Sequence, residues 1–343
     1  MIAALITGAE TVELREFDDP VPPELGVVVD ISFCGICGTD VHAYQSGRPY
    51  TPAICGHEWS GTVSAVGRAV RSLSEGDRVV VAAAPACGAC AACLAGQADR
   101  CLAAFAAVTG RDQLAPPHGG FAPRIAVAAS RVVVADPALT DEEAAQVEPA
   151  TVAFHAVRTS RLRLGDTAVI QGAGPIGLST LQWVRAGGAG RIIVIEPNEQ
   201  RRALAAALGA HDVVAPEHAD DLVREHSHGL GADVVYECVG RPFAIQTAVD
   251  LARRGGSMCL IGLADADASI VPAVWLVKEI HVTAALAYQR EEFEMAMGMI
   301  ADGRMQVEPL HTSTTRLDGL ADALADLAGG RSEQTKVLVN PNW

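Results

Sequence analysis

Four cysteines lie close together in the segment APACGACAACLAGQADRC, residues 84–101, with the spacing C-x2-C-x2-C-x7-C. A cluster of this kind can be a disulfide framework, an iron–sulfur site, a structural zinc site or a redox centre. We expect a cytoplasmic protein, because the first ten residues contain no basic region and no cleavage-like site. The cytoplasm keeps thiols reduced, so metal ligation is favoured over disulfide bonds. The four residues are Cys87, Cys90, Cys93 and Cys101.

Other side chains of metal-ligand type are spread over the first 150 residues. They are Cys37 in CGICGTDVH, His57 and Glu58 in CGHEWSG, and Glu148 in QVEPA. Zinc takes cysteine, histidine and carboxylate ligands, and a catalytic zinc site uses three and leaves a position open for water or substrate. A single histidine or cysteine is more often an ordinary core or surface residue. The combination, however, predicts a catalytic metal centre.

The segment GAGPIG, residues 172–177, has the glycine pattern of a dinucleotide-binding turn. It follows a predicted strand and opens a predicted helix, and Glu196 ends the next strand. The glycines permit close approach of the backbone to a pyrophosphate, and the carboxylate accepts hydrogen bonds from ribose hydroxyls. Glu196 favours NAD because it repels a 2′-phosphate, whereas Arg201 and Arg202 keep NADP as the alternative. The expected cofactor-binding residues are Gly172, Gly174, Pro175, Ile176, Gly177, Glu196 and Arg201.

Two sequence patterns predict the elements that position these motifs. Residues 1 to about 145 contain short β-rich runs broken by glycine and proline, which indicates a mostly antiparallel, loop-rich domain. Beyond residue 166, apolar strands alternate with helices, as a doubly wound parallel sheet requires. The final run TKVLVNP most simply rejoins the first domain, which makes the α/β unit an insertion. The helices predicted in that unit are 175–188, 198–210, 218–228 and 243–256.

The composition excludes several kinds of partner. The net charge is −15 over 343 residues, and Lys278 and Lys336 are the only lysines. Such a charge repels the phosphates of nucleic acids and of anionic membranes. No run approaches the ~20 apolar residues that span a bilayer. The length predicts a globular protein of two domains.

The motifs, taken in this order, resemble the zinc-containing medium-chain alcohol dehydrogenase family over essentially the whole chain. The family pattern C-G-[ST]-D-x-H corresponds to residues 37–42, G-H-E corresponds to residues 56–58, and the four-cysteine spacing corresponds to the structural zinc. The resemblance implies an α/β protein with a GroES-like, mostly β catalytic domain (1–147 and 288–343) and a doubly wound Rossmann domain (148–287). A lobe of about residues 84–103 then holds a tetrahedral S4 zinc. An iron–sulfur cluster is the weaker alternative, because nothing else suggests electron transfer.

The resemblance also assigns roles around a catalytic zinc. Cys37 and His57 are ligands, and Glu58 and Glu148 compete for the third position. Asp40 orients His57 from the second coordination sphere. The family further implies two zinc ions per chain and a homo-oligomer, either a dimer or a tetramer.

Proton and hydride transfer involve further residues in the family. Thr39 is placed to accept the alcohol proton, and His42 relays it to solvent together with the cofactor ribose. Ile176 packs on the nicotinamide face opposite the substrate. Side chains expected in the substrate pocket are Tyr44, Trp59 and Tyr288.

Within the family, Glu148-Pro149 and the following ATVAFHAV are similar to the branch of polyol, threonine and 2,3-butanediol dehydrogenases. The segment VKEIHVTAALAYQREEF is most similar to the butanediol group. Sorbitol dehydrogenases carry an arginine where this chain has Ala287, which disfavours extended polyols. We therefore expect zinc- and NAD-dependent oxidation of a small secondary alcohol or vicinal diol. Threonine, another amino alcohol or a polyol is the alternative substrate, and a non-catalytic nucleotide-binding relative is the remote alternative.

Overall fold

The chain folds as two compact units. The computed structural model describes residues 1–46, 51–330 and 332–343. One unit comprises Met1–Glu148 with Gln289–Trp343, and the other comprises Pro149–Tyr288. The sequence predicts boundaries at 147/148 and 287/288. Within the described residues, no helix combines the length and the apolar character needed to cross a bilayer.

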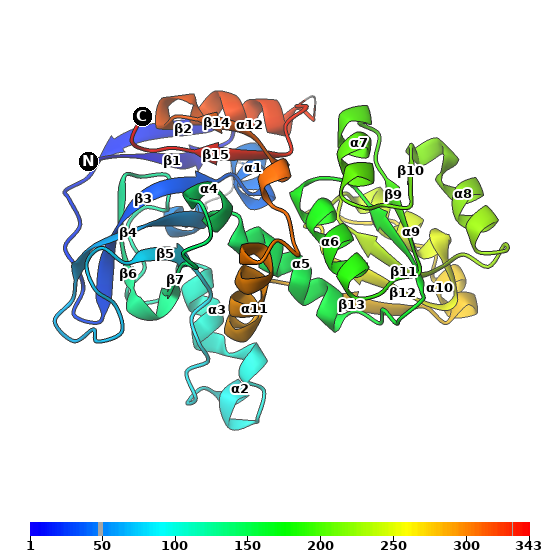
Figure 1. The fold of residues 1–343 in the computed structure, drawn as a ribbon, viewed down its shortest axis with the longest axis horizontal. Helices are drawn as coiled ribbons and strands as arrows, with labels where there is room; N and C mark the ends of the chain where they lie inside the picture. The colour runs from blue at the N-terminus through cyan, green and yellow to red at the C-terminus, as the bar shows by residue number, and fades with distance from the viewer. Residues whose placement is uncertain (47–50, 331) are drawn as a thin grey trace. The chain divides into compact units, whose positions relative to one another are not determined.

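The first unit is built on a mostly antiparallel sheet in the order β14-β15-β3-β4-β5-β7, with β6 also pairing β3 (Figure 1). A separate hairpin, β1 with β2, pairs antiparallel. The last strand, β15, pairs antiparallel with β3. The strands are β1 (Ile2–Gly8), β2 (Thr11–Glu16), β3 (Gly26–Gly35), β4 (Glu58–Val66), β5 (Arg78–Val81), β6 (Arg124–Ala128), β7 (Val132–Val134), β14 (His311–Thr315) and β15 (Lys336–Val339).

Apolar strand residues make the core of this unit. Val27, Val28 and Val29 are all buried in β3, because this strand has neighbours on both edges and is covered on both faces. The β-rich run RIAVAASRVVV forms two strands, since a 3-10 turn at Ala129–Arg131 separates β6 from β7. The helices are α1 (Gly38–Ser46), α2 (Ala91–Leu94), α3 (Leu102–Val108), α4 (Asp141–Ala144), α11 (Arg290–Ala301) and α12 (Leu320–Ala328), with 3-10 turns η1 (Pro52–Ile54), η2 (Ala98–Arg100), η3 (Ala129–Arg131), η5 (Glu308–Leu310) and η6 (Leu317–Gly319).

The cysteine-rich lobe projects from this sheet with α2 and α3 (Figure 1). Its apolar side chains Leu94, Leu102 and Phe105 are 77%, 59% and 51% exposed. Burial of apolar surface therefore contributes little to the stability of the lobe, which must depend on another kind of interaction.

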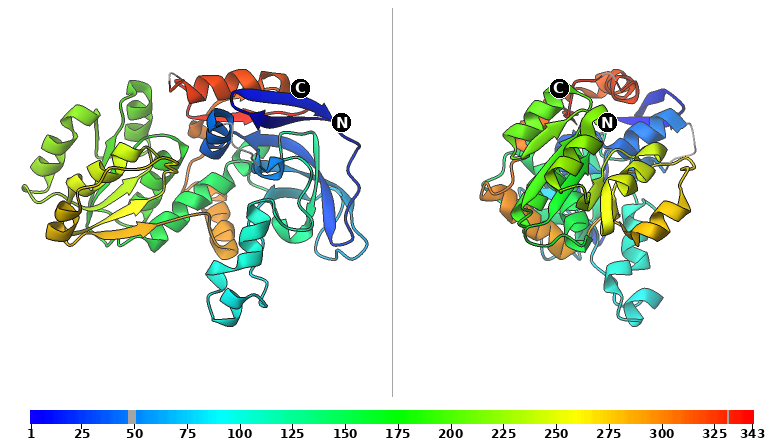
Figure 2. Two further views of the ribbon diagram at one scale, coloured as in Figure 1. Left: turned by 180° about the vertical axis from the view of Figure 1, so that it is seen from behind. Right: turned by 90° about the vertical axis from the view of Figure 1, so that its right-hand side faces the viewer.

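The second unit is a parallel sheet in the order β10-β9-β8-β11-β12-β13, with helices on both sides (Figure 2). The order reverses between β8 and β11, which are neighbours in space but not in sequence. The strands are β8 (Thr167–Gln171), β9 (Arg191–Ile195), β10 (Asp212–Val214), β11 (Ala232–Glu237), β12 (Ala252–Leu260) and β13 (His281–Ala284). The helices are α5 (Val147–Thr159), which crosses the unit boundary, α6 (Pro175–Ala186), α7 (Glu199–Ala207), α8 (Ala219–His226), α9 (Pro242–Leu251) and α10 (Pro272–Lys278), with the 3-10 turn η4 (Pro216–His218).

The helix predicted over 243–256 is wrong at its C-terminal end, because α9 stops at Leu251 and β12 begins at Ala252. Lys278 explains the early stop. Its ammonium donates to the carbonyl oxygens of Val249, Asp250 and Ala252 at 2.9, 2.7 and 2.6 Å. A cation at a helix C-terminus satisfies carbonyls that have no partner within the helix.

Candidate functional site

Strand pairing brings the two expected ligand segments together. Cys37 lies between the end of β3 and the start of α1, and His57 immediately precedes β4. Because Gly35 is the register partner of Glu58, the end of β3 meets the start of β4. The donor atoms of Cys37, His57 and Glu58 all lie within 4.8 Å of one another. This spacing suits a common metal ion.

A hydrogen bond fixes the imidazole of His57. Its Nδ1 lies 2.8 Å from the carbonyl oxygen of Ile54. Since a carbonyl only accepts, Nδ1 carries the hydrogen and Nε2 offers its lone pair to a metal.

Asp40 has a different role from the one expected. Its carboxylate accepts from the backbone N–H of Cys37 at 2.8 Å and from that of Gly56 at 3.0 Å. The His57 ring bonds to a carbonyl instead, so Asp40 acts on it through its charge. The buried carboxylate thereby joins the two segments that carry the ligands, and burial raises its pKa.

Glu58 forms a buried ion pair that the sequence analysis missed. Its Oε2 contacts Nζ of Lys336 in β15, and Lys336 also donates to the carbonyl oxygen of Ile36 at 3.0 Å. Gly35 makes this contact possible, because a Cβ there would lie 2.2 Å from Oε2. A lysine within the apolar run TKVLVNP was the available signal, since a charge in a buried strand needs a partner.

The charges around this site favour a cation. Burial lowers the pKa of His57, but the charges of Cys37, Asp40 and Glu148 raise it by more, so that it lies well above its usual value. Burial likewise lowers the pKa of Lys336. The charges of Glu58, Cys37 and Glu148 raise it by more, so the pKa lies above its usual value. Carboxylates and a thiol thus face both the His57 imidazole and the Lys336 ammonium. The donor set fits zinc.

Three further expected residues come from two helices. Glu148 lies in the first turn of α5, and its charge acts on both His57 and Lys336. Thr39 and His42 are three residues apart on α1, which places them on one helix face. Thr39 Oγ1 lies 3.6 Å from Cys37 Sγ. A hydroxyl thus stands beside an expected metal ligand.

The four lobe cysteines converge. Their sulfurs all lie within 4.8 Å of one another, with 3.5 Å from Cys90 to Cys93 and 3.9 Å from Cys90 to Cys101. Four sulfurs at ~2.3 Å from a tetrahedral zinc would be about 3.8 Å apart. Backbone hydrogen bonds, first that of Cys93, lower the pKa of Cys90 to about 6. The donor set fits a closed S4 zinc site.

The glycine turn in the second unit has the geometry of a phosphate cradle. Gly172 has φ +89°, a conformation that favours glycine, and a Cβ on Gly177 would lie 1.9 Å from the carbonyl oxygen of Gly172. A Cβ on Gly174 would meet no atom of the described residues within 4 Å. Two glycines thus serve the turn and its packing, while the third leaves open space at the N-terminus of α6.

Glu196 is tied to that turn. Its Oε2 accepts from the backbone N–H of Ala173 at 2.7 Å, and its Oε1 accepts from that of Asn198 at 3.0 Å. Arg202 donates to the carbonyl oxygens of Glu196 and Pro197, whereas the backbone N–H of Arg201 donates to the side chain of Asn198. The carboxylate that the sequence predicts at a ribose is therefore held beside the glycine turn.

Two family models match the chain. The model described as "Alcohol dehydrogenase GroES-like domain" matches residues 23–137, and the model described as "Zinc-binding dehydrogenase" matches residues 175–302. The chain belongs to the zinc-containing medium-chain alcohol dehydrogenase family. It is thus an alcohol oxidoreductase of two domains, one GroES-like and one with a Rossmann-type parallel sheet.

Other members of this alcohol dehydrogenase family match the chain over almost its whole length. The (R,R)-butanediol dehydrogenase of Bacillus subtilis is 30% identical over 357 residues, with 100% of both chains covered. The sorbitol dehydrogenase of the same organism is 30% identical over 350 residues, covering 100% of this chain and 98% of its own. A zinc-binding dehydrogenase from Sinorhizobium meliloti, solved bound to NADP, has a TM-score of 0.85 and 29% identity, with 99% of each chain covered.

The expected substrate-pocket residues of this dehydrogenase have mixed surroundings. Tyr44 and Trp59 belong to the hydrophobic core of the first unit and are 7% and 2% exposed, so each has a packing role. Tyr288 ends the second unit, and Ala287 before it has φ +55°. The pocket assignment of these tyrosine and tryptophan side chains stays a prediction.

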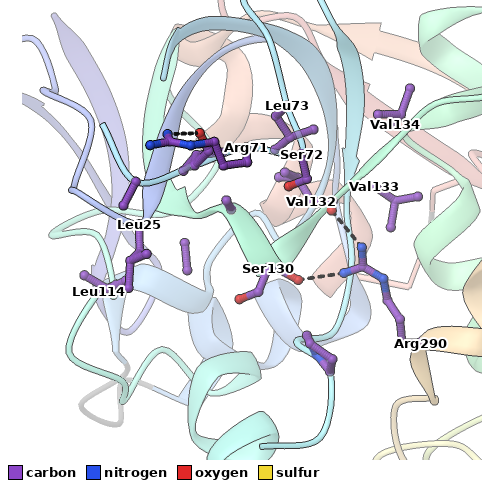
Figure 3. Close-up of a pocket in the computed structure, with 15 residues that line it drawn as sticks. Leu25, Arg71, Ser72, Leu73, Leu114, Ser130, Val132, Val133, Val134 and Arg290 are labelled. Atoms are coloured by element: carbon purple, nitrogen blue, oxygen red, sulfur yellow. Dashed lines mark hydrogen bonds between the residues drawn. The ribbon is translucent and has the colours of Figure 1, made fainter. Parts of the chain in front are cut away.

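A hollow of about 640 Å³ lies elsewhere in the first unit (Figure 3). Aliphatic side chains from Leu25 to Val134 line it, together with Arg71 and Arg290. Arg290 donates to the carbonyl oxygens of Ser130 and Val132, as Figure 3 shows. None of the expected catalytic residues lines this hollow.

Proposed function

We propose that this chain is an NAD-dependent dehydrogenase that oxidises small secondary alcohols or vicinal diols to ketones. The observation that carries the proposal is the convergence of Cys37 and His57 beside two carboxylates in one unit. The glycine turn beside Glu196 in the other unit supports a dinucleotide. A non-catalytic nucleotide-binding relative would need the glycine turn but not the metal-ligand side chains of the first unit.

Two zinc sites belong to this proposal. The catalytic ligands are Cys37, His57 and Glu148, and the four lobe cysteines hold a structural ion. Glu148 is preferred over Glu58 as the third ligand because Lys336 already neutralises Glu58 in a buried pair. That pairing would have to break before Glu58 could bind a metal.

The chain's own residues handle the proton. When bound, zinc would supply the positive charge that favours ionisation of an alcohol hydroxyl, and NAD⁺ would supply the hydride acceptor. Thr39 accepts the hydroxyl proton, and His42, on the same face of α1, passes it toward solvent. One alcohol and one NAD⁺ thus become one ketone, one NADH and one proton.

The cofactor preference rests on Glu196. A 2′-phosphate beside this carboxylate would be repelled, and the guanidinium of Arg202 is already engaged with two backbone carbonyls. The Sinorhizobium relative bound to NADP makes NADP the alternative.

The substrate class rests on the relatives and on Ala287. The named relatives act on butanediol and sorbitol, and the methyl group of Ala287 offers no hydrogen bond to distal hydroxyls. A short diol is therefore preferred over a hexitol. Threonine or another amino alcohol remains the second candidate in this branch.

A homo-oligomer completes the proposal. β13 is an edge strand of the parallel sheet, and apolar side chains around it are exposed: Val282 is 47%, Leu286 73% and Leu276 78% exposed. An exposed apolar sheet edge is suited to pairing with a second copy. Light scattering after size-exclusion chromatography measures the assembly, and a monomer would contradict this part.

Two measurements test the central proposal. Elemental analysis should return two zinc ions per chain, and NAD⁺ reduction should be fastest with 2,3-butanediol in a panel that includes sorbitol, threonine and ethanol. Faster turnover of sorbitol would overturn only the substrate. NAD⁺ reduction by a zinc-free enzyme would remove the metal from the proposal.

A further inference from the structure

Glu237, the last residue of β11, is completely buried at the carboxyl edge of the parallel sheet. Its side-chain Oε1 accepts from the backbone N–H of Val239 at 2.8 Å and from that of Gly240 at 2.9 Å. One carboxyl oxygen therefore fixes the turn that leads from β11 to α9.

The backbone of the same residue reaches two other loops. Its carbonyl oxygen accepts from Ile261 N–H at 3.0 Å and from Gly262 N–H at 2.9 Å, in the loop that follows β12. The next residue, Cys238, donates its N–H to the carbonyl oxygen of Gln171 at the end of β8. Glu237 and its neighbour thus connect the loops that leave three adjacent strands.

The turn after β11 packs against the glycine turn. A Cβ on Gly172 would lie 3.2 Å from Cγ2 of Val239, and a Cβ on Gly177 would lie 3.6 Å from Cβ of Cys238. Both turns leave the sheet at the point where the strand order reverses. In open α/β sheets, ligands bind in the crevice at this point.

Two buried oxygens here have no hydrogen-bond partner among the described residues. They are Oε2 of Glu237 and Oε1 of Gln171. The two residues are register partners on parallel strands, so their side chains lie on one face of the sheet. Burying such groups costs stability, and burial raises the pKa of Glu237. A costly buried carboxyl is typical of a position that serves a functional site.

We propose that Glu237 is a positioning residue for the dinucleotide. It contacts no cofactor atom itself, and it holds the turn Cys238–Gly240 at the separation from the glycine turn that the cofactor requires. This inference rests on the dinucleotide site of the proposed function. A merely structural role would lower stability and leave cofactor affinity unchanged.

The test uses zinc-loaded Glu237→Ala, Glu237→Gln and Glu237→Asp variants. Alanine removes both hydrogen bonds, and aspartate keeps the charge but shortens the reach by one methylene. We expect both to raise the Kd and the KM for NAD⁺ by about 10–50-fold while kcat at saturating NAD⁺ changes less than about threefold. Glutamine should restore affinity, because its amide oxygen accepts the same two N–H groups and its NH₂ can donate to Gln171.

Ser257→Ala is the matched control. The Ser257 hydroxyl is also buried in this sheet without a described partner, but it lies away from the carboxyl edge. Its loss should leave the Kd for NAD⁺ unchanged. Calorimetric titration gives the Kd, and thermal melts of the same samples give the stability.

The possible outcomes distinguish a failure of this inference from a failure of the proposed function. Failure of the parent protein to bind NAD⁺ or NADP⁺ would overturn the proposed function. A parent that binds NAD⁺, with Glu237→Ala or Glu237→Asp binding equally well, would overturn the positioning role alone. If Glu237→Ala does not fold, Glu237→Asp decides, and a lower melting temperature with an unchanged Kd would contradict the inference.

Discussion

The Nζ of Lys336 lies directly against the Glu58 carboxylate, and both side chains are only 2% exposed. The pair connects the last strand of the chain to the segment that carries His57. A buried charge that loses its partner destabilises a protein far more than the intact pair stabilises it. The pair can therefore be tested from either side.

Lys336→Met should destabilise the metal-free protein by about 3–5 kcal/mol, because it leaves Glu58 buried and unpaired. Adding Glu58→Gln should recover part of this loss. Lys278, the only other lysine, provides the matched control. Because Lys278 does not pair with Glu58, adding Glu58→Gln to Lys278→Met should recover no stability. Urea unfolding measures the four variants. Equal recovery in both backgrounds would show that the pair is not specific.

Thr39→Val should reduce kcat by roughly 10²–10⁴-fold, because it keeps the volume of the side chain and removes the hydroxyl that we propose as the proton acceptor. Zinc content and the Kd for NAD⁺ should not change, since the metal ligands and the glycine turn are intact. Thr109→Val, at the end of the lobe helix, is the control for a lost threonine hydroxyl. Turnover near the parent value in Thr39→Val would exclude the threonine from the proton path.

Cys93→Ser should remove one zinc ion per chain and destabilise the lobe, because its exposed apolar side chains provide little core. Cys259→Ala, at a buried cysteine of the other unit, should leave the zinc count at two. Elemental analysis and limited proteolysis within residues 84–108 measure the two effects. A single zinc in the parent protein would contradict the structural site.

Gly174→Ala and Gly177→Ala should weaken NAD⁺ binding for different reasons. A Cβ on Gly177 collides with the Gly172 carbonyl oxygen, so this variant should also melt at a lower temperature. A Cβ on Gly174 meets nothing in the described part of the chain, so this variant should melt normally and bind NAD⁺ at least about tenfold more weakly. Normal binding by Gly174→Ala would place the pyrophosphate elsewhere.

The raised pKa of Glu237 makes stability depend on pH in a defined direction. Above the unfolded value of ~4.3 the unfolded chain ionises first, so the native state binds more protons and stability falls as pH rises toward the native pKa. Glu237→Gln removes this dependence. The melting temperature of the variant, relative to the parent, should therefore increase from pH 4.5 to pH 7. A constant difference would mean that burial does not raise this pKa.

The glycine turn and the cysteine cluster could be predicted from the sequence because short-range geometry determines them. The glycine turn needs a strand, a turn and a helix in immediate succession, and the lobe cysteines lie within fifteen residues. The parallel sheet of the second unit also followed from the alternation of apolar strands and helices. Such features depend on few contacts between distant parts of the chain.

Long-range partners were not readable in this way. Lys336 is 278 residues from Glu58, and no periodicity relates the two positions. The predicted C-terminal end of α9 is wrong because Lys278, 26 residues beyond Ala252, caps the helix: its ammonium donates hydrogen bonds to the last carbonyl oxygens. The role of Asp40 depended on where the backbone of Gly56 lies, which only the pairing of β3 with β4 determines.

The position of β15 also has a consequence for the order of folding. The chain emerges from the ribosome N-terminus first, so Cys37, His57 and Glu58 are synthesised long before Lys336. Until β15 pairs with β3, the Glu58 carboxylate lacks the ammonium that neutralises it in the native fold. The second unit, Pro149–Tyr288, is by contrast one continuous segment that can fold as soon as it has emerged. The first unit is therefore completed last, and a nascent chain stalled before residue 336 would have a folded second unit and an unfinished first unit.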